Sequence, residues 1–205
     1  MLKDFNMSGN IRGFISFDIC KQELLDKLRK VQQMLRETGA DLKLVSPQNI
    51  HVTIRFLGNI PESMVDNIHA EMKKVSFGPF HAEIRRVGAF PALKRPRVVW
   101  AGLERGSEKM RDVFNQLEPH IRKLRFNPDS KGFSPHLTIA RVRTKRNEPA
   151  LISCLRTLSD YRFGEFEVRC LKLKKSRLTP EGPIYSTLRE VCPGEINRFN
   201  EKLKI

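Results

Sequence analysis

The amino-acid sequence predicts an α+β domain of two pseudo-symmetric lobes, each an antiparallel sheet covered by helices, with a functional cleft between the lobes. Three observations lead to this prediction. β-prone segments alternate with amphipathic helical segments, one four-residue motif occurs twice in equivalent strands, and no low-complexity segment divides the 205 residues. We therefore expect an N-terminal extension over residues 1–10, one bilobal domain over 11–192 and a peripheral helix over 193–205.

Hydrophobic periodicity separates strands from helices in the first half of the chain. Apolar residues recur at helical spacing over residues 21–38, where Gly39 ends the pattern, and again after Pro61, a favourable residue for a first helical turn. The predicted strands are 11–17, 42–45 and 49–57. This half is therefore predicted to run strand, helix, two strands and helix.

The second half continues the alternation. Its predicted strands are 80–90, 97–103, 135–142, 163–178 and 184–191, and its predicted helices are 107–124 and 149–158. Pro119 falls inside the first of these helices and should kink or split it, because proline lacks the backbone N–H. In 163–178 the apolar alternation changes phase between Cys170 and Leu171, which predicts a β-bulge.

The charge balance bears on the partner. Lysine and arginine outnumber aspartate and glutamate by 38 to 23, a net charge of +15. Such an excess attracts polyanions, which favours a nucleic-acid partner over the alternative of a merely basic protein. No apolar run approaches the roughly 18 residues of a spanning helix, so we expect no membrane association. The N-terminus shows no signal-peptide pattern, so we expect a cytoplasmic protein.

The four cysteines, Cys20, Cys154, Cys170 and Cys192, lie far apart in the sequence. None forms a Cys-x-x-Cys pair, and none has a histidine at the spacing of a zinc site. We therefore expect free, mostly buried thiols in a reducing compartment.

A short motif occurs twice. His51-Val52-Thr53-Ile54 recurs as His136-Leu137-Thr138-Ile139, each copy in a predicted strand that follows a turn. Because strand side chains alternate, the histidine and threonine of each copy share one face. In the first strand Ile50, Val52, Ile54 and Phe56 are expected on the opposite, apolar face. The repeat therefore predicts two polar faces that line one cleft.

A single His-x-Thr occurs often by chance, and a lone strand histidine is usually a structural residue. Two copies in equivalent contexts favour a shared site. The other histidines, His69, His81 and His120, lack a matching hydroxyl and are expected to be surface or packing residues. No carboxylate or third histidine accompanies either motif, so we expect no metal and no cofactor.

The chain resembles the 2H phosphoesterases, specifically the RNA 2′,3′-cyclic phosphodiesterases of bacteria and archaea, formerly known as 2′-5′ RNA ligases. The resemblance covers nearly the whole chain and rests on the segments IRGFISFDI, NIHVTIRFLG, PRVVWAGL, FSPHLTIARV and EGPIYSTL. The sequence departs from the family pattern in about ten residues before the first strand and in the tail after Val191.

This resemblance implies metal-independent hydrolysis of an RNA 2′,3′-cyclic phosphate to a 2′-phosphate end. Histidine holds or lacks a proton near neutral pH, so two of them suit acid–base catalysis. The family implies that His51 is the proton donor and His136 the proton acceptor, whereas the residues alone leave these roles open. Thr53 and Thr138 are placed to donate hydrogen bonds to the phosphoryl oxygens.

Three further residues are candidates for binding the substrate. Arg55 shares the parity of His51 in a strictly alternating strand, so we expect it to reach the phosphate or the RNA backbone. Arg141 corresponds to an arginine that follows the family's second motif, although strict alternation would turn it away unless the strand bends. Phe14 is a candidate for stacking on a base, as aromatic residues do on single-stranded RNA. A solvated strand-end arginine and a core phenylalanine are the alternatives.

The expected partner is RNA with a 2′,3′-cyclic phosphate end, tRNA halves included, and we expect the protein to be a monomer. Three other classes remain open from the sequence: a 2′-5′ RNA ligase that runs the same chemistry backwards, an enzyme of cyclic phosphates on ADP-ribose or free nucleotides, and a non-catalytic RNA-binding module. Two complete motifs argue against the last of these.

Overall fold

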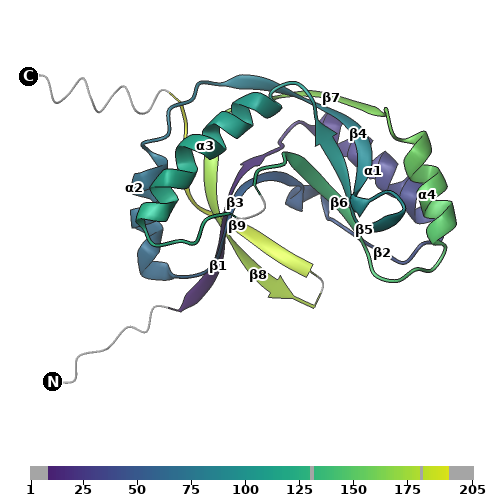
Figure 1. Ribbon diagram of the computed structural model, residues 1–205, viewed down its shortest axis with the longest axis horizontal. Coiled ribbons are helices and arrows are strands. Elements are labelled where there is room, and N and C mark those ends of the chain that lie inside the picture. The colour runs from purple at the N-terminus through teal and green to yellow at the C-terminus, as the bar shows by residue number, and fades with distance from the viewer. Residues whose placement is uncertain (1–8, 130–131, 181, 194–205) are drawn as a thin grey trace, which may run out of the picture.

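The computed structural model describes residues 9–129, 132–180 and 182–193 and shows the predicted α+β fold. Its antiparallel sheet has nine strands, and four α-helices pack on it (Figure 1). The strands are β1 (Asn10–Asp18), β2 (Leu42–Leu44), β3 (His51–Pro61), β4 (Phe80–Ala92), β5 (Arg95–Leu103), β6 (His136–Val142), β7 (Arg162–Val168), β8 (Leu171–Thr179) and β9 (Gly182–Val191). The helices are α1 (Gln22–Glu37), α2 (Val65–Met72), α3 (Ser107–Lys123) and α4 (Glu148–Thr157), with short 3-10 turns at Pro47–Asn49 and Glu62–Met64.

The two predicted lobes are the halves of one continuous sheet. The strand order is β7-β4-β5-β6-β3-β1-β8-β9, and β2 pairs with β6 off this path. The halves meet between β3 and β6, where Val52 and Leu137 are the one matched residue pair among the described residues. Each half therefore keeps its own group of strands, and a narrow antiparallel contact joins them.

The helices are exchanged between the halves. The first helix along the chain, α1, packs against β6 and β7 and next to α4. Helices α2 and α3 pack on each other and on β9 and β3, which belong to the half built from the chain's two ends. Each half is therefore covered by helices from both parts of the chain. This exchange supports a single folding unit.

The buried faces of these helices follow their apolar periodicity. In α1 the buried positions include Leu24, Leu28, Val31 and Leu35, and in α3 they include Met110, Val113, Leu117 and Ile121. These stripes cover one face of the sheet, where residues such as Val52 and Leu137 are fully buried. No helix in the described ranges is long and apolar enough to cross a membrane.

Two elements differ from what was expected in part or in full. Helix α3 runs from Ser107 to Lys123 with Pro119 inside it, so the proline does not split the helix. The segment expected as one bulged strand is two strands, because β7 pairs with β4 whereas β8 pairs with β1 and β9. The change of phase at Cys170 and Leu171 therefore marks a crossing from one end of the sheet to the other. The expected C-terminal helix and most of the expected extension lie outside the described residues.

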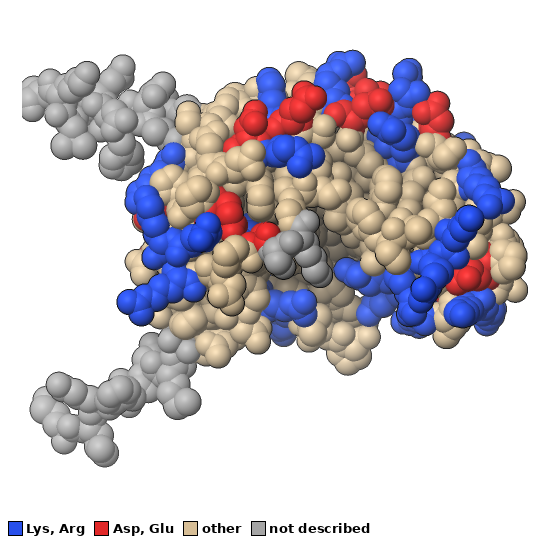
Figure 2. Space-filling model, in the orientation of Figure 1, with Lys and Arg blue, Asp and Glu red and all other residues tan. Residues whose placement is uncertain are grey.

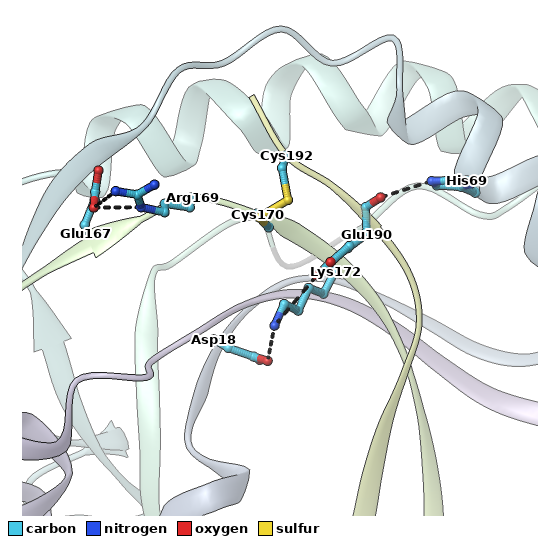
Figure 3. Close-up of a disulfide and its surroundings, with 8 residues drawn as sticks. All are labelled: Asp18, His69, Glu167, Arg169, Cys170, Lys172, Glu190 and Cys192. Atoms are coloured by element: carbon cyan, nitrogen blue, oxygen red, sulfur yellow. Dashed lines mark hydrogen bonds and ion pairs between the residues drawn. A yellow bond between two sulfur atoms is a disulfide. The ribbon is translucent and has the colours of Figure 1, made fainter. Parts of the chain in front are cut away.

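The expectation of four free thiols is also wrong. Cys170 and Cys192 form a disulfide with an S–S distance of 2.02 Å (Figure 3), while Cys20 and Cys154 are free. The disulfide joins the residue before β8 to the residue that follows β9, so it closes the base of the β8–β9 hairpin. Nothing in the spacing of 22 residues between the two cysteines indicated the pairing. With this pair oxidised, cysteine usage no longer supports a reducing compartment.

Candidate active site

The two His-x-Thr motifs lie side by side at the junction of the halves. In a strand, the residues on either side of a given residue point to the opposite face. His51 and Thr53 flank Val52, and His136 and Thr138 flank Leu137. Val52 and Leu137 are fully buried, whereas the two histidines and the two threonines are partly exposed. The structure therefore brings both motifs to one solvent-accessible face of the sheet, opposite the apolar core.

Both imidazoles are held by the same type of hydrogen bond. Nδ1 of His51 lies 2.7 Å from the backbone oxygen of Asn49, and Nδ1 of His136 lies 2.7 Å from that of Ser134. A carbonyl only accepts hydrogen bonds, so each Nδ1 carries a proton and donates it. The neutral rings therefore present an unprotonated Nε2. In His51 this atom lies 2.9 Å from Oγ1 of Thr53, whose hydroxyl donates to it.

The environment lowers the pKa of both histidines. Burial is the largest cause in each case, and the hydrogen bond to the backbone carbonyl opposes it. The positive charge of Lys174 lowers the pKa of His51 further and a protonated His136 does so too, while the carboxylate of Asp18 raises it. The charge of Arg141 lowers the pKa of His136. Both rings therefore favour the neutral form at neutral pH.

Each motif is followed by an irregularity in the ladder. On β3 the register with β1 shifts between the pairs Ser16–Thr53 and Ile15–Arg55, so Ile54 has no partner in this ladder. On β6 the register with β5 shifts in the same way, which leaves Ile139 unmatched between Thr138 and Ala140. Such a bulge reverses the alternation beyond it. The two halves therefore share a bulge one residue after the threonine.

The bulges decide which later side chains face the site. Phe56 was expected on the apolar face, but its side chain is 60% exposed, so that expectation is wrong. Its counterpart in the second motif is Arg141, which is also exposed. The charge of Arg141 acts on both His136 and Tyr185, so Arg141 lies near the site. The bend that this residue required is therefore present.

Arg55 is placed differently from the expectation. Beyond the bulge it no longer has the parity of His51, and it is only 7% exposed. Its Nε donates to Glu118 of α3 at 2.7 Å, its Nη1 donates to the backbone oxygen of Phe56 at 2.9 Å, and its Nη2 donates to the backbone oxygen of Asn127. Arg55 therefore ties β3 to α3 and to the chain that follows this helix.

Phe14 is buried next to the histidine of the first motif. It is 3% exposed, and its ring stacks on that of His51 with centroids 4.9 Å apart. Tyr185 of β9, which the sequence reasoning did not single out, lies edge-on to Phe14 at 4.9 Å and to His51 at 5.3 Å. With so little exposed surface Phe14 can hold the imidazole plane, but it offers little area to a base. The more exposed ring of Phe56, 6.5 Å away, offers that area.

An ion-pair cluster breaks the symmetry of the two motifs. Asp18 of β1 is the register partner of His51, whereas the register partner of His136 on β5 is Gly102. Nζ of Lys174 lies 2.8 Å and 3.0 Å from the two carboxylate oxygens of Asp18, and Nζ of Lys172 lies 3.2 Å from one of them (Figure 3 shows the contact of Lys172). Burial alone would raise the pKa of Asp18, but the two lysines outweigh it and lower the pKa.

The remaining histidines have ordinary roles. Nε2 of His69 lies 3.1 Å from the backbone oxygen of Glu190 (Figure 3), and Nδ1 of His120 lies 3.0 Å from a carboxylate oxygen of Glu71. His81 is exposed on β4. None of the three lies next to either motif, in agreement with the expectation that they are surface or packing residues.

The protein is therefore a sheet of two like halves, with a His-x-Thr motif on each of the two strands that join them, and the family with this sequence is a class of phosphoesterases. The chain belongs to the LigT-like phosphoesterase family, whose model matches residues 19–100 and 103–185. It is 38% identical over 168 residues to the RNA 2′,3′-cyclic phosphodiesterase of Aeropyrum pernix, covering 82% of this chain and 96% of that protein. It is 40% identical over 182 residues to the protein of the same name from Archaeoglobus fulgidus, covering 87% and 98%.

Solved structures show the same fold. TT0787 of Thermus thermophilus superposes with a TM-score of 0.73 at 27% identity, over 89% of this chain and 97% of that one. The apo form of LigT from E. coli superposes with a TM-score of 0.70 at 17% identity, over 90% and 98%. The overall fold is therefore shared with these two proteins.

Proposed function

We propose that the protein hydrolyses the 2′,3′-cyclic phosphate at the end of an RNA strand to a 2′-phosphate, with His51 as proton donor and His136 as proton acceptor. The observation that carries the proposal is the matched pair of imidazoles, each oriented by a hydrogen bond from Nδ1 to the backbone oxygen two residues before it. Relatives that align with this chain over nearly their whole length are named RNA 2′,3′-cyclic phosphodiesterases.

The proposed reaction uses both Nε2 atoms. Nε2 of neutral His136 takes a proton from water as the water oxygen attacks phosphorus. Protonated His51 donates from Nε2 to the 3′ oxygen as the P–O3′ bond breaks, leaving a 3′-hydroxyl and a 2′-phosphate. His136 ends protonated and His51 neutral, so a proton exchange with solvent restores the starting state.

The hydroxyls and the arginine have supporting roles. The Thr53 hydroxyl, which now donates to Nε2 of His51, can rotate toward a phosphoryl oxygen once that nitrogen is protonated. Thr138 holds the equivalent position beside His136 and is proposed as the second donor. Arg141 supplies a fixed positive charge near both His136 and Tyr185, where the phosphate's negative charge would lie.

Arg55 and Phe14 were expected to bind substrate, and their contacts support other roles. Arg55 is occupied by Glu118 and two backbone oxygens, and Phe14 is covered by His51 and Tyr185. We propose Phe56 in place of Phe14 as the surface on which a base stacks. We further propose that the enzyme acts as a monomer in the cytoplasm, with tRNA halves among its substrates. We also propose that it catalyses weak 2′-5′ ligation, in which a 5′-hydroxyl of a second RNA attacks phosphorus in place of water and the P–O3′ bond breaks.

The test is an assay with a short RNA that ends in a 2′,3′-cyclic phosphate, carried out in EDTA. We expect a 2′-phosphate product, which phosphorus NMR distinguishes from a 3′-phosphate. A 3′-phosphate product would mean that the P–O2′ bond breaks instead. A reaction that stops in EDTA and returns with added metal would contradict the two-histidine mechanism.

A further inference from the structure

A basic hollow lies at β2 and the end of β6, in the half of the sheet that carries the second motif. It has a volume of about 330 Å³ and is lined by Arg36, Ala40, Leu42, Lys43, Leu44, Arg143 and Pro180. All the charged side chains in this set are cations, and they come from the end of α1, from β2 and from the residue that follows β6. Figure 2 shows lysine and arginine side chains gathered over β2 and the end of β6. The hollow is therefore a site of concentrated positive charge.

Among the described residues, these cations have no acidic partner. Arg36, Lys43 and Arg143 are all exposed, and no carboxylate in the described part of the chain forms an ion pair with any of them. Elsewhere the protein pairs its arginines readily, as Arg85 with Asp160 at 2.7 Å illustrates. Three unpaired cations around one concavity favour an anion with more than one negative charge.

Cations along β6 lie between the hollow and the site. Lys43 of β2 is the register partner of Arg141, and Arg143 follows Arg141 by two residues, which places it on the same side of the strand. Arg141 in turn acts on His136 and Tyr185. Pro180, at the turn of the β8–β9 hairpin that carries Tyr185, lines the hollow from the other half. A row of cations therefore leads from the histidines to the hollow.

From this geometry we infer that Arg36, Lys43 and Arg143 form a subsite for the backbone phosphates of the RNA strand behind its cyclic end. The inference rests on the proposed function, and it names the substrate as an oligonucleotide. A strand rises about 3.3 Å per residue, so Arg143, seven residues after His136 with one of them in the bulge, lies roughly 20 Å from it along the direction of β6. A cyclic mononucleotide held at His136 does not span this distance, whereas a strand of several nucleotides does.

The test compares two substrates and two matched variants. The substrates are a 2′,3′-cyclic mononucleotide and an eight-nucleotide RNA with the same cyclic end. The variant Arg36→Gln/Lys43→Gln/Arg143→Gln loses three positive charges from the hollow. The control Lys30→Gln/Lys73→Gln/Lys123→Gln loses three from exposed positions on α1, at the end of α2 and on α3. Both variants therefore have the same net charge and differ only in where charge is lost.

We expect the hollow variant to lose about tenfold or more in kcat/KM on the eight-nucleotide RNA, mainly through KM, and to keep the wild-type rate on the mononucleotide. The control should match wild type on both. In binding measurements with the same RNA, the slope of log affinity against log salt should become shallower by about 2 in the hollow variant, because each lost contact to a single strand contributes roughly 0.7. The control's slope should fall by less than one contact.

Several results would overturn the inference. One is an unchanged kcat/KM and salt slope for the hollow variant on the RNA; another is equal losses in the two variants, which would indicate net charge alone. Loss of binding to poly-glutamate with no loss of binding to RNA would instead assign the hollow to an acidic protein. If wild type hydrolyses neither substrate, the proposed function fails, while the salt-dependent binding comparison still decides the subsite.

Discussion

Val52 and Leu137 are antiparallel register partners across the junction of the two halves, and the residues that flank them are the four polar residues of the two motifs. A single matched pair thus aligns two imidazoles that are 85 positions apart in the sequence (51 to 136). Because both Nδ1 atoms are engaged by backbone oxygens of the segments just before β3 and β6, the ring orientations depend on the backbone and not on any substrate.

Replacement of either histidine should remove an acid or a base from the reaction. His51→Ala and His136→Ala should each lower kcat by about 10²–10⁴-fold on a cyclic-ended RNA, and the double variant should be little worse than either single, since the two act as a unit. His81→Ala is the control, because this exposed histidine lies in neither motif. Additive losses in the double variant would show that the two rings act independently.

The pH dependence follows from the direction of the two pKa shifts. The reaction needs one ring protonated and one neutral, and burial lowers the pKa of both. At neutral pH both rings are mostly neutral, so the population with a single proton increases as pH falls. The optimum of kcat/KM in the free enzyme should therefore lie below about 6.5, the ordinary value for histidine. A pH–rate profile with its optimum above that value would contradict these shifts.

Asp18 and Lys174 should move the pKa of His51 in opposite directions. The charges that act on His51 are those of Asp18, Lys174 and His136. The ring of Tyr185 also contacts His51, and Lys172 pairs with Asp18. Asp18→Asn removes the negative charge, leaves both lysines and should lower the pKa. Lys174→Met removes a positive charge from the other side of the ion pair and should raise it.

An NMR titration of the histidine ring protons measures these shifts directly. The resonances are assigned with His51→Gln and His136→Gln. The pKa of His136 should stay in place in the Asp18 and Lys174 variants, because its register partner is Gly102 and neither charge is among the groups that shift it. Shifts of the same sign at His51, or equal shifts at both rings, would exclude this asymmetry.

Replacing Arg55 should lower the stability of the fold, whereas replacing Arg141 should raise KM and leave the stability nearly unchanged. Arg55→Met leaves the carboxylate of Glu118, whose side chain is 16% exposed, without its cation, and should cost about 3–5 kcal/mol of unfolding free energy. Arg141→Met changes an exposed residue, so it should alter stability by less than about 0.5 kcal/mol while raising KM. Denaturant unfolding and steady-state kinetics on both variants make the comparison. An Arg55 variant that folds normally but loses activity would restore its expected role in binding.

The sequence was sufficient for the main features of the fold and of the site. A tetrapeptide repeat in two alternating strands is local information, and it placed His51, Thr53, His136 and Thr138 on one face. The bulge after each threonine was not predictable, because it arises from the register with β1 and β5. For this reason Arg55 was expected on the polar face and Phe56 on the apolar face, whereas the structure places each residue on the opposite face.

Other features depend on strands that are distant in the sequence. Asp18, Lys174 and Tyr185 come from β1, β8 and β9, and no local pattern links them to His51. The apolar alternation of 163–178 changes phase where the chain changes partners from β4 to β1. A bulge within one strand produces the same change of phase, so periodicity could not identify it as a break between two strands. The disulfide likewise depends on the closing of the β8–β9 hairpin.

Phe56 and Arg141 occupy equivalent positions in the two halves but differ in chemistry, so the two sides of the site are unlike. Each residue follows the bulge that the two halves share. Phe56 presents an aromatic ring on one side of the site, and Arg141 presents a guanidinium on the other. A perfectly duplicated site would accept a ligand equally well after a half-turn, because its two walls would be indistinguishable. A nucleic-acid strand has two different ends, and a site with unlike walls binds it in one orientation. Divergence at this pair of positions, together with the Asp18 cluster beside only one of the two histidines, would let the proposed site distinguish the polarity of an RNA strand.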